Sequence, residues 1–130
     1  MDASPDSRAP EFSLPSTDGE IKLSDRLAKS AVLLVFYPGD DTPVCTRQLC
    51  DYRDNLEVFA DLGVDVLAIN PQSLSSHERF AKKHDLPFPI LSDADKQVCR
   101  AYDAIGLFGL TKRVLVLIDR EGHIRWRCSD

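Results

Sequence analysis

The chain has 130 residues, of which 43% are hydrophobic and 28% are charged, and its formal net charge is -5. This length and composition predict one globular domain over residues 1–130, and the acidic balance without a basic stripe argues against a nucleic-acid partner. Because no apolar run is long enough to span a bilayer and the first residues lack an apolar leader, we expect no membrane segment and a cytoplasmic location.

The first predicted element is an N-terminal β-hairpin. Two short strands, Glu11–Leu14 and Glu20–Leu23, flank the turn signal Ser16-Thr17-Asp18-Gly19, and one helical turn, Ser24–Leu27, follows. The next run, Ala31–Tyr37, is continuously apolar, which is typical of a strand buried on both faces.

A helix is predicted directly after the Pro-rich turn that ends this strand. Pro43 suits the first helical turn, where its missing N–H costs nothing, and Thr42 suits the N-cap. Gly63 is a stop signal, so one helix is expected up to that point. Its inward stripe consists of Cys45, Leu49, Tyr52, Leu56 and Phe59.

Strands and helices continue to alternate through the rest of the chain. The pattern Ser75-Ser76-His77-Glu78 predicts the start of a charged helix that ends near His84, with His77 and His84 exposed to solvent. The other expected elements are strands at Val64–Asn70, Pro89–Leu91, Val114–Ile118 and His123–Arg127, and a helix from a cap at Asp93 to Ala101. This order indicates an α/β fold with a mixed central sheet flanked by helices, and a thioredoxin-like fold fits it.

The four cysteines, Cys45, Cys50, Cys99 and Cys128, carry the chemistry that the sequence suggests. Their spacing does not fit a zinc site, and a reducing compartment makes a redox pair a better interpretation than a structural disulfide. Cys45 falls in the first turn of a helix, where free N–H groups and the helix dipole favour a thiolate. Arg113 is a candidate for a further stabilising cation, whereas the carboxylates of Asp40 and Asp41 would oppose a negative sulfur.

Cys50 lies five residues after Cys45, which turns the helix by roughly 140° and places Cys50 on the solvent side. In an ideal helix the two Cα atoms are about 8.6 Å apart, beyond the ~7 Å limit for a disulfide. A bond between these two cysteines would therefore require the helix to unwind. Cys99 is interpreted as a packing residue, with a backup resolving thiol as the alternative, and Cys128 as a free, exposed thiol.

The pattern Pro38-x-x-x-Thr42-x-x-Cys45 resembles the active-site signature of peroxiredoxins. The longer stretch from Phe36 through Cys50 to Asp54 resembles the subfamily called peroxiredoxin Q, or bacterioferritin comigratory protein. The resemblance covers nearly the whole chain.

This resemblance implies an atypical two-cysteine peroxiredoxin that reduces hydrogen peroxide and organic hydroperoxides. It implies that Cys45 is the peroxidatic cysteine and Cys50 the resolving one, with an intramolecular disulfide between them. Thr42 and Arg113 match the residues that bind the peroxide oxygens, and Pro38 matches the one that shields the pocket. The expected protein is a monomer without metal, haem or flavin, recycled by thioredoxin or a glutaredoxin-type reductant.

Two other functions compete with this interpretation. A thioredoxin-like disulfide oxidoreductase would need a C-x-x-C motif at the helix start, and the spacing here is different. A redox switch that senses peroxide would use the same disulfide without sustained turnover.

Overall fold

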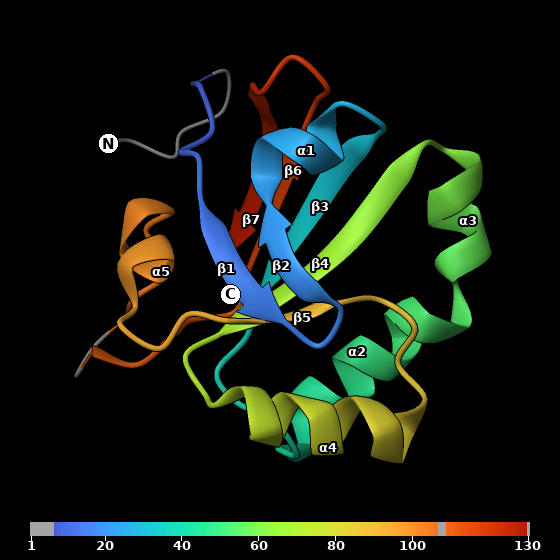
Figure 1. The fold of residues 1–130 in the computed structure, drawn as a ribbon, viewed down its shortest axis with the longest axis vertical. Helices are drawn as coiled ribbons and strands as arrows, with labels where there is room; N and C mark the ends of the chain where they lie inside the picture. Colours follow the sequence, from blue (N-terminus) through green and yellow to red (C-terminus); the bar gives the residue numbers. More distant parts are fainter. Residues whose placement is uncertain (1–6, 107–108, 130) are drawn as a thin grey trace.

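The computed structural model, which describes residues 7–106 and 109–129, is built around a seven-stranded mixed sheet (Figure 1). The strand order across the sheet is β2-β1-β5-β4-β3-β6-β7. In chain order the strands are β1 (Ser13–Ser16), β2 (Gly19–Lys22), β3 (Ala31–Phe36), β4 (Val64–Asn70), β5 (Ile90–Ser92), β6 (Val114–Ile118) and β7 (Ile124–Ser129). The predicted mixed sheet and the N-terminal hairpin β1–β2 are confirmed.

The two central strands, β3 and β4, run parallel to each other, and β6 joins β3 in the antiparallel direction. Both faces of β3 are buried, as its continuous apolar sequence predicts. Val32, Leu34 and Phe36 belong to one apolar core, whereas Leu33 and Val35 belong to a second core on the other face. The sheet therefore separates two hydrophobic layers, each of which is covered by helices.

Five helices cover the sheet in the described part of the chain: α1 (Leu23–Leu27), α2 (Pro43–Asp54), α3 (Leu56–Asp61), α4 (Leu74–His84) and α5 (Gln97–Ala101). Side chains of α1 and α5 fill the first core, and side chains of α2, α3 and α4 fill the second. Figure 1 shows α2 and α4 close together at one end of the sheet. Within the described residues, no helix combines the length and apolar character needed to cross a membrane.

The expectation of a single helix from Pro43 to Gly63 is wrong, because the chain breaks at Asn55 into α2 and α3. Asn55 leaves helical geometry with φ -115° and ψ 18°, and its side-chain Nδ2 donates to the carbonyl of Asp51 at 2.8 Å. This side chain therefore supplies a hydrogen-bond partner for one of the backbone carbonyls that the end of α2 would otherwise leave without one. The consequence for the site is that α2 is a separate twelve-residue helix.

Two predicted helix starts are also displaced. Helix α4 is capped by Ser73, whose Oγ accepts from the amide of Ser76 at 3.2 Å, so the expected capping box lies inside the helix. Helix α5 has Lys96 at its N-cap, but the carboxylate of Asp93 accepts from the amide of Cys99 at 2.8 Å. Asp93 therefore does bind the start of this helix, although from further upstream than predicted.

Candidate active site

Cys45 lies in the first turn of α2, directly beyond the end of the central strand β3. Thr42 occupies the N-cap position with an extended backbone, and Pro43 follows as the first helical residue, as predicted. The first helical hydrogen bond runs from the amide of Thr46 to the carbonyl of Thr42 at 2.8 Å. The amide of Cys45 therefore precedes the helical ladder, at the positive end of the helix.

The side chain of Cys45 is only 1% exposed and packs into the second core. Thr42 and Pro38, by contrast, are exposed at the turn that leads into α2. The hydroxyl of Thr42 does not cap the helix and instead donates to the carbonyl of Gly39 at 3.3 Å. The Cys45 side chain is thus almost completely closed to solvent, whereas the two predicted pocket residues lie at the surface.

Arg113 reaches this turn through the pairing of β6 with β3. The antiparallel register places Phe36 opposite Val114, so the next residues outward, Tyr37 and Arg113, stand across from each other. Arg113 is half-buried there. The structure thus brings Pro38, Thr42, Cys45 and Arg113 to the same end of the sheet.

Cys50 lies further along α2, and its predicted position on the solvent side is wrong. Its side chain is half-buried and packs against the second core beside the residues that α2 turns toward the sheet. The helix between the two cysteines is intact, and all four cysteines carry free thiols. The side chain of Cys50 is consequently less exposed than the helical spacing from Cys45 predicts.

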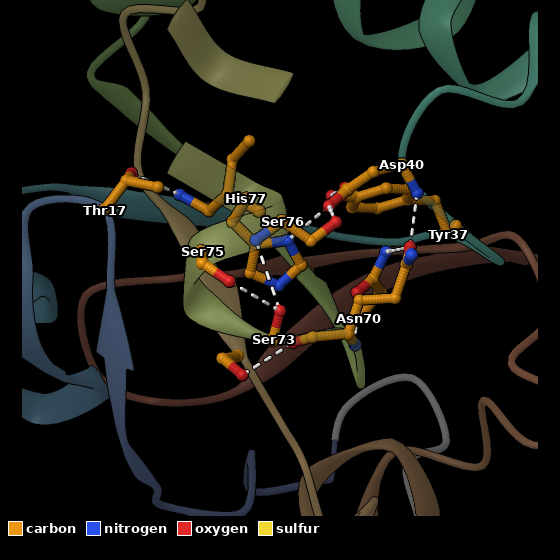
Figure 2. A network of polar contacts seen from close by, with 12 residues as sticks. Thr17, Tyr37, Asp40, Asn70, Ser73, Ser75, Ser76 and His77 are labelled. Carbon is orange, nitrogen blue, oxygen red and sulfur yellow. Dashed lines mark hydrogen bonds and ion pairs between the residues drawn. The ribbon is translucent and has the colours of Figure 1, made fainter. Parts of the chain in front are cut away.

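A buried polar network lies beside the Cys45 turn, and sequence reasoning missed it (Figure 2). The Asp40 carboxylate accepts from the Tyr37 hydroxyl at 2.5 Å, from the Ser76 hydroxyl at 2.7 Å and from Nδ1 of His77 at 2.8 Å. The expectation that His77 is exposed is therefore wrong, because its side chain is 0% exposed. A signal was available: Leu74, His77, Phe80 and His84 recur at helical spacing and form the inward stripe of α4.

These contacts set the charge of Asp40. Burial alone would raise the pKa of this carboxyl, but the hydrogen bonds from His77, Tyr37 and Ser76 outweigh it and hold the pKa below its ordinary value. Burial, together with the neighbouring Asp40 carboxylate, raises the pKa of Tyr37 well above its usual range, so this hydroxyl stays a donor. Asp40 is thus an ionised group whose oxygens are directed at donors of the network.

Asp41 also interacts with α4. Its carboxylate lies 3.3 Å from Nζ of Lys83 and 3.6 Å from Nε2 of His84. Of the two acidic residues of the turn, Asp41 thus has a cationic partner on α4, whereas Asp40 accepts hydrogen bonds from hydroxyl and ring donors.

The remaining two cysteines differ in environment. Cys99 is fully buried in the first core, and burial, together with the nearby Asp93 carboxylate, raises the pKa of its thiol to about 12. Such a thiol is an inert packing residue under ordinary conditions. Cys128 is exposed on β7. Among the described residues, no group of three or more His, Cys, Asp or Glu side chains is arranged to hold a metal ion.

Known proteins are similar to this chain in sequence and in fold. The model of the AhpC/TSA family matches residues 5–127. Peroxiredoxin Bcp of Bacillus subtilis is 39% identical over 130 residues, which cover 92% of this chain and 82% of the relative.

Two solved structures are also similar over most of the chain. Peroxidoxin BcpB of Mycobacterium tuberculosis has a TM-score of 0.90 and 30% identity, covering 96% of this chain and 84% of that one.

The bacterioferritin comigratory protein of Xanthomonas campestris, studied for alkyl peroxide reduction, has a TM-score of 0.85 and 28% identity. The match covers 91% of this chain and 80% of the Xanthomonas chain. The predicted thioredoxin-like architecture is therefore confirmed by proteins of known structure.

Proposed function

Since the chain belongs to the AhpC/TSA family, we propose that it is a thiol peroxidase that reduces hydrogen peroxide and organic hydroperoxides. It acts as one domain, in antioxidant defence, with a thiol reductant of the thioredoxin or glutaredoxin type. The observation that carries the proposal is the position of Cys45 in the first turn of α2. Thr42 and Arg113 lie at the same end of the sheet. The proposal also includes that the protein is a monomer in the cytoplasm. Cysteines are normally reduced in that compartment, and the four cysteines here are free thiols.

In the first step, the thiolate of Cys45 attacks one oxygen of the peroxide and the O–O bond breaks. The sulfur is oxidised to a sulfenic acid, and the departing oxygen takes a proton and leaves as water or an alcohol. Negative charge develops on that oxygen in the transition state, so donors fixed beside it accelerate the step. The amides at the start of α2, the Thr42 hydroxyl and the Arg113 guanidinium are the donors that we assign to this role.

In the second step, the thiol of Cys50 displaces hydroxide from the sulfenic acid of Cys45, so that a disulfide forms and water leaves. Exchange with an external dithiol then restores both cysteines. Because α2 is intact from Pro43 to Asp54, its first turns must unwind before the two sulfur atoms meet. The break at Asn55 separates α2 from α3, which allows this unwinding to remain local.

Mass spectrometry after one equivalent of peroxide tests the assignment of the two cysteines. The wild-type chain is expected to contain a Cys45–Cys50 disulfide, and Cys50→Ser is expected to trap a sulfenic acid on Cys45, because the resolving thiol is gone. A disulfide to Cys128 instead would reassign the resolving role. Oxidation that stops at one equivalent in the presence of reductant would indicate a redox switch rather than a peroxidase.

Local unwinding on oxidation is a separate prediction. The backbone chemical shifts of residues 45–50 are expected to lose their helical values in the disulfide form, because an intact helix holds the two Cα atoms too far apart. The shifts of α4 serve as the internal control and are expected to stay helical. Helical shifts over residues 45–50 in the disulfide form would contradict this prediction.

A further inference from the structure

The carboxylate of Asp40 links the turn before Cys45 to helix α4 (Figure 2). Its side chain is 2% exposed, and two of its three side-chain donors, Ser76 and His77, come from α4. The third donor, Tyr37, directly follows β3. This single group therefore ties together the strand, the turn and the helix that surround the entrance to α2.

A buried histidine at position 77 lowers the stability of the fold relative to an apolar residue there. Its ring is fully buried, and while Nδ1 binds Asp40, Nε2 has no hydrogen-bond partner among the described residues. A buried polar atom without a partner costs stability, and an apolar side chain on the same inward stripe of α4 would avoid that cost. The contact between Nδ1 and Asp40 is the feature that a histidine supplies there and an apolar residue would not.

Helix α4 and the residues just before it make further contacts with the neighbouring part of the site. The backbone amide of Asp40 donates to Oε1 of Gln72, just before α4 begins. Toward the other end of α4, the His84 carbonyl accepts from Nη1 of Arg53 on α2 at 2.6 Å. Helix α4 thus contacts both the turn that precedes α2 and the last turn of α2, on either side of the segment that must unwind.

We propose that His77 is a positioning residue for Cys45: by holding Asp40, it keeps the turn at residues 37–42 and the first turn of α2 folded. This inference rests on the proposed peroxidase function for its chemical consequence. Once Cys45 is a sulfenic acid, unwinding leads to the disulfide with Cys50. In the folded site, a second peroxide molecule instead oxidises the sulfenic acid to a sulfinic acid and is itself reduced to water or an alcohol. The contact between His77 and Asp40 therefore sets the balance between these two outcomes.

Two pairs of variants test this role. Ser76→Ala removes a donor to Asp40, whereas Ser75→Ala is the matched control, because the Ser75 hydroxyl contacts only Ser73 in the network. His77→Leu removes the donor from the ring position, whereas His77→Asn restores an N–H close to Nδ1. Should His77→Leu fail to fold, the two serine variants carry the test on their own.

The first readout is amide hydrogen exchange of residues 46–49 in the reduced protein, whose amides donate the first hydrogen bonds of α2, and it does not depend on activity. Loss of one hydrogen bond to a charged group is expected to speed this exchange by about tenfold or more in Ser76→Ala and His77→Leu. Exchange in Ser75→Ala is expected to match the wild type, and His77→Asn to lie near it. Equal exchange in His77→Leu and His77→Asn would overturn the proposal, and so would equal exchange in Ser76→Ala and Ser75→Ala where His77→Leu does not fold.

The second readout is the fraction of Cys45 found as sulfinic acid at a fixed excess of peroxide. This fraction is expected to fall severalfold in Ser76→Ala and His77→Leu relative to their controls, because unwinding then competes better with the second oxidation. Faster exchange with an unchanged sulfinic fraction would overturn the positioning role. Failure of the wild-type chain to turn over peroxide would refute the proposed function, while the exchange result would still decide whether the contact holds the turn.

Discussion

Cys45→Ser is expected to lower the rate of peroxide consumption at least about 10³-fold. A serine hydroxyl at this position is not ionised at neutral pH, and it offers the peroxide oxygen no nucleophile comparable to a thiolate. The substitution is nearly isosteric in the second core, where Cys45 is buried, so the fold should persist. Peroxide loss in the presence of a thiol reductant measures the effect, and far-ultraviolet circular dichroism checks the fold.

Cys128→Ser is the matched control for this experiment. It makes the same chemical change on an exposed thiol of β7, and we expect a wild-type rate. The proposed function makes Cys45 the only site of attack. Retention of activity by Cys45→Ser together with a loss in Cys128→Ser would place the reaction at the other thiol and refute the assignment.

The central part of the fold can be predicted because its signals are local. The strands β3, β4 and β6 follow from short apolar runs, and the start of α2 follows from Thr42 and Pro43. The break at Asn55 cannot be predicted in this way, because the apolar stripe of α2 continues in phase into α3. Periodicity records which face is buried, and it does not record where the backbone stops being helical.

The site residues also differ in whether local sequence signals predict them. Cys45 and Thr42 are predictable because a strand, a turn and a helix start follow each other directly in the sequence. Arg113 is distant in sequence and reaches them through the register between β3 and β6. The sequence suggests it as a cation next to an apolar strand, and the resemblance to a family adds its role toward the peroxide. The contact of His77 with Asp40 joins residues 37 positions apart, and it depends on the rotation of α4 about its axis. Position on the inward stripe predicts that His77 is buried, but it does not identify the partner.

Arg113 is the second residue whose replacement should have a large effect. The register of β6 against β3 brings it across from Tyr37, at the turn that leads to Cys45. A guanidinium at this place offers several N–H donors in a fixed plane to the two oxygens of a peroxide. Arg113→Gln removes the charge, so the rate constant of reduced protein with peroxide is expected to fall by about 10²- to 10³-fold. Arg113→Lys keeps the charge but loses the planar fork, and it should lie between that variant and the wild type.

A comparison of two reagents can separate the role of Arg113 in breaking the O–O bond from a general effect on the Cys45 thiol. Alkylation of Cys45 by iodoacetamide needs the thiolate but has no O–O bond to polarise, so Arg113→Gln is expected to slow it by less than about tenfold. Arg127→Gln is the control, because Arg127 lies on β7 and donates to the carbonyl of Asp103, so its rate with peroxide should not change. Equal losses with both reagents would mean that Arg113 acts on the thiolate alone. An unchanged peroxide rate in Arg113→Gln would refute the role of Arg113. The donors at the start of α2 would then be the groups that stabilise the departing oxygen.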